Sequence, residues 1–154
     1  MRTAAAAALV IFLTVAAGEA KQHSTFRVHA EASANDGPVF STQIRSQLSG
    51  KTVTIGKVPL ISERDVTGLQ VYRASDGSYG ALLQLNDHGR LALDSVSIER
   101  RGSFLFVFIN GRPITELQID RRVSDGQSYI ASRPTTNEIE RMKKNWPARV
   151  PRKP

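Results

Sequence analysis

Cysteine is absent from the 154 residues of this chain. Its absence excludes a disulfide scaffold, a thiolate metal site, a cysteine nucleophile and a bacterial lipid anchor attached through cysteine. The chain is also too short for a large multidomain enzyme, and its length suits a single domain. With 40% hydrophobic and 23% charged residues, it is too apolar to be wholly disordered.

Motifs that would identify an enzyme are also missing. The sequence has no Gly-x-Ser-x-Gly elbow and no glycine-rich phosphate loop followed by Lys-Ser or Lys-Thr. The histidines His23, His29 and His88 show no metal-ligand spacing, and the aspartates are scattered, several of them at turns. We therefore predict a protein that is not an enzyme and has no cofactor and no metal. A small envelope hydrolase, or an inhibitor of one, remains an alternative without positive support.

Long apolar runs are absent except at the N-terminus. Ala4–Ala17 is broken only by Thr14, follows the positive charge of Arg2, and leads into small residues. This pattern predicts a signal peptide over residues 1–20, cleaved near Ala17 or Ala20, because a membrane-spanning helix needs about 20 apolar residues. We expect the mature protein to be periplasmic or secreted, with a single α+β domain over 21–146 and a basic, Pro-rich disordered tail over 147–154.

The net charge of +7 is concentrated at the C-terminus. Up to Glu140 the chain has 15 basic and 14 acidic residues, and beyond it six basic and no acidic residues. The high isoelectric point is therefore weak evidence for nucleic acid, which we do not expect as a partner. If the charge has a partner, an anionic membrane surface would meet it at the tail. The predicted contact residues are Arg141, Lys143, Lys144, Arg149, Arg152 and Lys153.

Alternating or continuous apolar patterns predict the strands. Phe26–Ala32 and Lys51–Ile55 alternate with period two. Ser103–Ile109 is the most apolar stretch after the N-terminal run, and it predicts a central strand buried on both faces. Phe40–Leu48 is ambiguous, since its apolar residues fit a helix while its Ser and Thr content does not favour one.

Turn residues predict how these strands connect. Asp-Gly within 74–78 predicts a hairpin between Leu69–Arg73 and Tyr79–Leu85. Asn110-Gly111 suits a type I′ turn, because both residues tolerate positive φ. Asp125-Gly126 predicts another turn, before a short strand at Tyr129–Ala131.

Capping residues predict two helices and one helical turn. Thr135 and Glu138 form a capping box before an apolar face of Ile139, Met142 and Trp146. Ser62 can cap a short turn. Asn86 suits an N-cap for Asp87–Glu99, although the residues alone leave this segment open between helix and strand.

Two pairs of arginines could form an anion-binding surface. The alternative interpretation is simpler and we prefer it. It assigns Arg100-Arg101 to a helix C-terminus, where cations offset the dipole, and Arg121-Arg122 to a solvated loop.

The order of these elements resembles the periplasmic head of the SecD/SecDF protein-export subunits. The likeness extends firmly over 58–146, and its motifs are turns and caps that are weak individually. The matching segments are Val58–Val66, Leu85–Leu91, Phe104–Ile114, Ile119–Gly126, Tyr129-Ile130 and Pro134–Ile139.

The resemblance implies an α+β fold, with a small mixed or antiparallel sheet and two helices packed on one face. It also favours helix for Asp87–Glu99. In that family the head contacts exported polypeptide, so we expect a non-enzymatic module that binds polypeptide or an envelope protein, without proton-driven transport of its own. The structural turn and cap residues are Asn86, Asn110, Gly111, Asp125, Gly126, Thr135 and Glu138.

Overall fold

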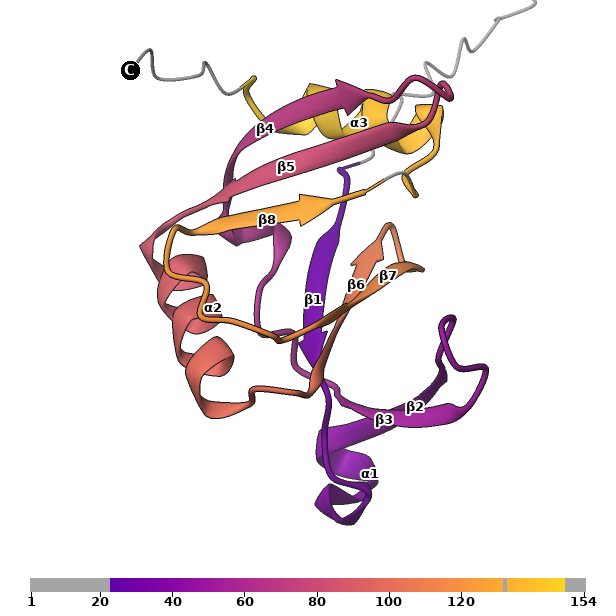
Figure 1. Ribbon diagram of the computed structural model, residues 1–154, viewed down its shortest axis with the longest axis vertical. Coiled ribbons are helices and arrows are strands. Elements are labelled where there is room, and N and C mark those ends of the chain that lie inside the picture. The colour runs from indigo at the N-terminus through magenta and orange to yellow at the C-terminus, as the bar shows by residue number, and fades with distance from the viewer. Residues whose placement is uncertain (1–22, 132, 149–154) are drawn as a thin grey trace, which may run out of the picture.

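The computed structural model describes residues 23–131 and 133–148 (Figure 1). The predicted signal peptide and its cleavage site lie outside these residues, as do Arg149, Arg152 and Lys153 of the predicted tail. The α+β class is confirmed, because antiparallel strands and helices share one hydrophobic core. The strands divide among three antiparallel sheets in the described part of the chain.

The first sheet has the order β1-β6-β7 and contains the predicted central strand. β1 spans Phe26–Ala30, β6 spans Phe104–Ile109 and β7 spans Arg112–Gln118. β6 has partners on both sides, and its consecutive residues Phe106 and Val107 are both buried, so both faces are covered at its centre. Asn110 and Gly111 have φ values of 51° and 77°, as the predicted turn requires.

The second sheet has the order β4-β5-β8 and lies across the first (Figure 1). β4 spans Val66–Arg73, β5 spans Tyr79–Leu85 and β8 spans Gln127–Ile130. The hairpin between β4 and β5 is confirmed, and Asp76 stabilises its turn by accepting the Ser78 N–H at 2.9 Å.

Helix α2 spans Asp87–Glu99, as the resemblance implied. Asn86 caps it by accepting the Gly89 N–H at 2.9 Å. A Cβ atom at Gly89 would lie 3.0 Å from the Cβ of Asp65 and 3.1 Å from that of Leu85. Gly89 lowers the intrinsic helix propensity of this segment, but because it has no side chain it lets α2 pack closely against β5 and the short helix η2, Glu63–Asp65.

Helix α3 spans Thr136–Asn145 and packs against β4 and β5 (Figure 1). Its predicted capping box is present, since the Thr135 hydroxyl accepts the Glu138 N–H and the Glu138 carboxylate accepts the Thr135 N–H. Ile139 and Met142 are fully buried on its apolar face.

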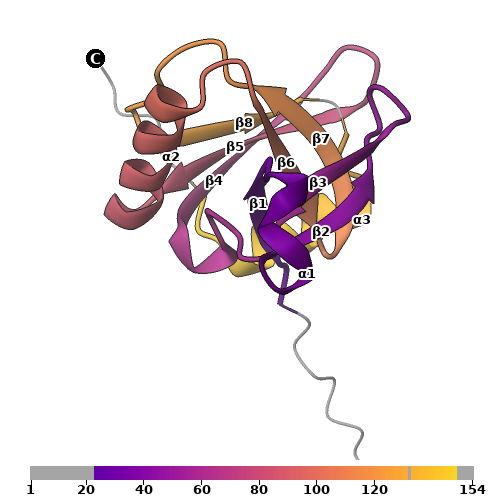
Figure 2. The same ribbon diagram turned by 90° about the horizontal axis from the view of Figure 1, so that it is seen from below.

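The third sheet is a two-stranded ribbon that protrudes from the body in Figure 1, and its strands are seen along their length in Figure 2. The short helices η1 (Ala34–Asp36) and α1 (Gly37–Phe40) precede β2 (Ser41–Arg45), which pairs with β3 (Thr52–Gly56). The ambiguous stretch from 40 to 48 is therefore mainly strand and turn. A helix ends at Phe40 because the chain turns into a strand that pairs with β3.

Candidate functional site

The turn before β8 packs between β5 and α2 and contacts both. Gly126 has φ +67°, and a Cβ atom there would lie 3.1 Å from the Cβ and Cγ of Arg90. The Gly126 carbonyl accepts the Leu85 N–H at 2.8 Å and the Gln84 side-chain N–H at 3.1 Å. Asp125 accepts the Gln127 N–H at 3.0 Å. The predicted turn thus fixes where β8 begins.

β8 forms an open edge of the second sheet. Among the described strands it pairs only with β5. The opposite edge is partly covered, because the Leu69 N–H donates to the Pro147 carbonyl at 3.0 Å and Leu69 forms a parallel bridge with Ala148. The part of the chain that follows α3 therefore protects β4, whereas no described segment pairs with the other side of β8.

The register of β8 determines which backbone groups point toward its open edge. Hydrogen-bonded and non-hydrogen-bonded pairs alternate in an antiparallel ladder. Leu85 bonds to Gly126, so Ser128 and Ile130 belong to the pairs that bond β5. The N–H and C=O of Gln127 and Tyr129 then point outward. The Gln127 N–H already donates to the Asp125 carboxylate. Tyr129 is therefore the residue whose backbone N–H and C=O both point outward and are available to a partner strand.

A cleft of about 300 Å³ borders this edge. Its walls come from β8, from the connection between β7 and β8, from α2 and from the first sheet. Both Ser128, which faces the core, and Tyr129, which faces outward, line the cleft, so it follows the strand edge itself. The apolar lining includes Val28, Ile61, Leu82, Leu93, Leu105 and Leu117.

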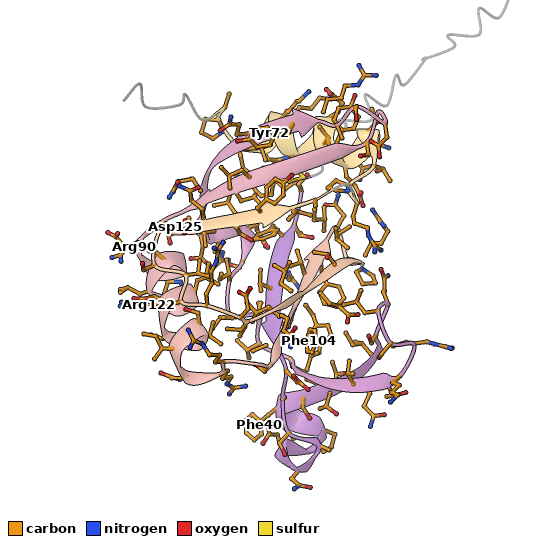
Figure 3. The ribbon with its side chains drawn as sticks, in the orientation of Figure 1. Phe40, Tyr72, Arg90, Phe104, Arg122 and Asp125 are labelled. Atoms are coloured by element: carbon orange, nitrogen blue, oxygen red, sulfur yellow. The ribbon has the colours of Figure 1, made fainter. Side chains whose placement is uncertain are left out.

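The connection between β7 and β8 is held against α2 by two contacts. The Arg122 guanidinium donates to both carboxylate oxygens of Asp94, at 2.6 and 2.8 Å. The Ser97 hydroxyl accepts the Val123 N–H at 2.9 Å. The hydrogen bond from Arg122 lowers the pKa of Asp94 below its usual value. Figure 3 shows Arg90, Arg122 and Asp125 on the side of the molecule where α2 meets this connection.

Two tyrosines lie on the outer face beside the cleft. Tyr72 of β4 is 39% exposed and Tyr129 of β8 is 53% exposed, and their ring centres lie 6.2 Å apart in an edge-to-face arrangement. Gly80 lies beneath the Tyr129 ring, because a Cβ atom there would be 3.0 Å from the Tyr129 hydroxyl. This glycine lets an exposed aromatic ring lie against β5, next to the open edge.

The predicted contact residues do not come together at this cleft. Arg141, Lys143 and Lys144 lie on α3, and none of them lines the cleft. Lys143 forms an ion pair with Glu140 at 3.0 Å. Asn86, Asn110, Gly111, Asp125, Gly126, Thr135 and Glu138 all occupy the turns and caps predicted for them. Of these, Asp125 also lines the cleft.

Arg121 and Arg122 are exposed and lie in the connection between β7 and β8, as the interpretation of a solvated loop expects. The sequence did not predict that Arg122 also forms the bidentate pair with Asp94, or that Arg121 lines the cleft. Sequence patterns missed most of the cleft, because its lining comes from strands of two sheets, from α2 and from the β7–β8 connection. The only local signal was an apolar Val123 between the arginines and the Asp125-Gly126 turn.

The histidines occupy three separate places. His88 pairs with Asp65 at 2.9 Å, His29 contacts the Gly56 carbonyl at 2.7 Å and His23 contacts Asn145 at 2.9 Å. None of them lines the cleft. Over residues 23–131 and 133–148, no three His, Asp or Glu side chains are grouped as a metal site would require. These positions give no support to the hydrolase alternative.

No helix in the described ranges has the length and apolar character needed to cross a bilayer.

Comparison with known proteins gives a structural likeness only. No protein-family model and no curated protein sequence matches the chain. A solved structure of SecDF, described as a membrane component that enhances protein export, aligns with 79% of this chain and 61% of its own, at 14% identity and TM-score 0.55. SecDF in a super-membrane-facing form aligns with 85% of this chain and 20% of its own, at 15% identity and TM-score 0.57.

A third structure, SecDF from Thermus thermophilus, aligns with a TM-score of 0.44 at 15% identity, covering 81% of this chain and 19% of its own. The chain therefore spans less than two thirds of the length of each SecDF chain. The first two alignments confirm the predicted SecD-like fold.

Proposed function

We propose that this chain is a non-enzymatic, extracytoplasmic module that binds extended polypeptide along the open edge of β8. The observation that carries the proposal is the apolar cleft running beside a strand edge with which no described segment pairs. A peptide added to that edge would gain main-chain hydrogen bonds, which demand little of its sequence. Its alternate side chains would enter the cleft, where Leu93 and Leu117 supply apolar contacts.

The backbone of Tyr129 is the central contact in this proposal. Its N–H and C=O point away from β5 and would bond a single residue of the added strand. The exposed rings of Tyr129 and Tyr72 would lie under the side chains that face away from the core.

The likeness to SecDF supports a polypeptide that is being exported as the ligand. SecDF is described as enhancing protein export, and this chain shares the fold of part of it. The N-terminal pattern at residues 1–20 supports the same compartment. Proton-driven transport is not part of the proposal, and neither is a catalytic step.

Two substitutions at one position test the edge. Tyr129→Ala removes the ring but keeps the N–H, whereas Tyr129→Pro removes both. Proline is tolerated on edge strands because its missing N–H faces outward there. The probe is a fluorescent synthetic peptide of alternating Val and Thr, followed by anisotropy. Tyr129→Pro should weaken binding roughly five- to tenfold relative to Tyr129→Ala, through the lost hydrogen bond.

Equal affinities for the two variants, with both melting like the native protein, would exclude pairing through this N–H. A Leu117→Gln variant checks the cleft independently, because Leu117 lines it from β7. It should weaken binding of the Val-Thr peptide more than binding of an alternating Ser-Thr peptide.

A further inference from the structure

A second surface, remote from the cleft, is apolar and unusually exposed. Val39 and Phe40 of α1 are 73% and 71% exposed, and Val58 after β3 is 81% exposed. Pro38 is exposed beside them. We call Pro38, Val39, Phe40 and Val58 the apolar tip. Figures 1 and 3 show α1 and Phe40 on the protruding ribbon, at the end of the molecule opposite α3.

The two segments of the tip are tied together through the backbone. The Lys57 N–H donates to the Phe40 carbonyl at 2.9 Å, and the Lys57 ammonium donates to the Pro38 carbonyl. The Ser41 hydroxyl donates to the Gly37 carbonyl at 2.9 Å. The backbone carbonyls of Gly37, Pro38 and Phe40 thus already accept hydrogen bonds, and Pro38 has no N–H that needs a partner. The tip can therefore enter a poorly hydrated environment without leaving these carbonyls unpaired.

The ribbon that presents the tip is basic. From residue 37 to 58 the chain carries Arg45, Lys51 and Lys57 and no acidic residue. The nearest acidic residue before the tip, Asp36, accepts the Ser33 N–H at 3.0 Å. The ribbon that presents the tip thus has a net charge of +3, while residues 1–140 as a whole have a net charge of +1. Lys57 lies at the tip, and Arg45 and Lys51 lie at the other end of the ribbon. A basic ribbon that ends in exposed apolar side chains matches a surface that is anionic outside and apolar beneath.

We propose that the apolar tip inserts into the interface of an anionic lipid bilayer, with Arg45, Lys51 and Lys57 attracted to lipid phosphates. Binding of this kind scales with the buried apolar area and with the charge of the lipid. The site is distinct from the predicted basic tail and from the β8 edge, and it does not depend on the proposed polypeptide binding. It would orient the module so that the β8 cleft stays in water while the ribbon touches the membrane.

Sedimentation with lipid vesicles tests the insertion. The full-length chain is compared with Val39→Ser/Phe40→Ser on vesicles that contain phosphatidylglycerol and on vesicles of phosphatidylcholine alone. The double variant should bind the anionic vesicles at least about tenfold more weakly, because two exposed side chains no longer leave water. Lys57→Gln should weaken binding to the anionic vesicles only. The N-terminal apolar run is present in every variant, so differences between variants report the tip.

Matched controls separate the tip from other surfaces. Leu91→Gln/Ile98→Gln removes two comparably exposed apolar side chains from α2 and should bind as the native chain does. A chain ending at Ala148 lacks the basic tail and should still lose vesicle binding when Val39 and Phe40 are replaced by serine. The proposal is overturned if the α2 variant loses as much binding as the tip variant, or if only the truncated chain loses it.

Fluorescence supplies a readout that folding defects cannot mimic. Trp146 is the single tryptophan and is buried. A Phe40→Trp variant should show an additional blue shift when phosphatidylglycerol vesicles are added, and a Leu91→Trp variant should not. If the indole introduced at the tip shows no shift while the protein remains vesicle-bound, the tip stays in water and insertion is excluded.

Discussion

The guanidinium of Arg112, at the start of β7, donates two hydrogen bonds of 2.9 and 2.6 Å to the carboxylate of Glu138 in α3. The same carboxylate accepts the Thr135 N–H at 2.8 Å. One acidic side chain therefore caps the last helix and fastens it to the β6–β7 hairpin. The capping role was predicted from sequence, whereas the link to Arg112 joins residues 26 positions apart.

Replacing Glu138 with glutamine should destabilise the protein by about 2 kcal/mol, because hydrogen bonds to a charged group are lost in a nearly buried place. Urea unfolding at neutral pH measures the change. Glu140→Gln is the matched control on the same helix, since Glu140 pairs with Lys143 in the exposed i,i+3 geometry and should cost less than about 0.5 kcal/mol. Similar losses for both variants would contradict the special role of Glu138.

Stability should fall in acid through Glu138 and Asp65. Burial opposes ionisation of both carboxyl groups. Hydrogen bonds from Arg112 and Thr135 more than offset this effect at Glu138 and lower its pKa below the ordinary value of 4.5. Hydrogen bonds from Ser62 and His88 do the same at Asp65, whose pKa falls below the ordinary value of 3.8. The stabilisation is thus complete above about pH 4.5 and is lost as pH falls through the lower folded-state values.

Urea midpoints measured between pH 7 and pH 3 check this dependence. In Glu138→Gln the acid-dependent part should shrink, and in a variant that also carries Asp65→Asn it should shrink further. An unchanged pH profile in both variants would assign the acid sensitivity to other groups.

Gly126→Ala should destabilise the protein and distort the cleft. The residue has φ +67°, and the new Cβ would meet the Arg90 side chain at 3.1 Å. Gly111→Ala is the control, since its φ of +77° imposes similar backbone strain in open space. We expect about 1–2 kcal/mol for the strain common to both variants, and a further loss only at Gly126. Chemical denaturation gives the free energy of unfolding of the two variants. Equal decreases would show that the Arg90 side chain moves aside without further destabilising the protein.

Asp94→Asn should loosen the wall of the cleft without unfolding the protein. The substitution removes the charge that holds Arg122, although the Ser97 hydroxyl still accepts the Val123 N–H. We expect faster hydrogen exchange at the Val123 amide and unchanged exchange in β6, which lies in the core. Uniform acceleration throughout the chain would instead indicate global destabilisation. A conservative control is Asp87→Asn, because Asp87 is exposed and its contact with Arg90 is long, at 3.7 Å.

Short-range chemistry made much of this fold predictable. Asn110-Gly111 requires positive φ at two successive residues, and both adopt it. The Thr135–Glu138 box and the Asn86 cap depend only on residues within one helical turn, so they form where the sequence places them. The resemblance to SecD was needed for Asp87–Glu99, because Gly89 and a broken apolar stripe weaken the local signal.

The parts that could not be predicted depend on contacts between distant residues. Phe40–Leu48 became turn and strand because β3 pairs with it, and Arg122 is held in an ion pair because Asp94 of α2 lies opposite it. The cleft draws on β1, β5, β6, β7, β8, α2 and the β7–β8 connection, so no window of sequence contains its pattern.

The sequence by itself determined most of the strands, the turns, the caps and the absence of thiol chemistry, since each depends on the intrinsic preferences of neighbouring residues. Only the tertiary structure decided that the edge of β4 is partly covered, that no described segment pairs with the other side of β8, and that Val39, Phe40 and Val58 remain in water. Both outcomes follow from which apolar surfaces the packed core has room to bury, and that is a property of the whole chain.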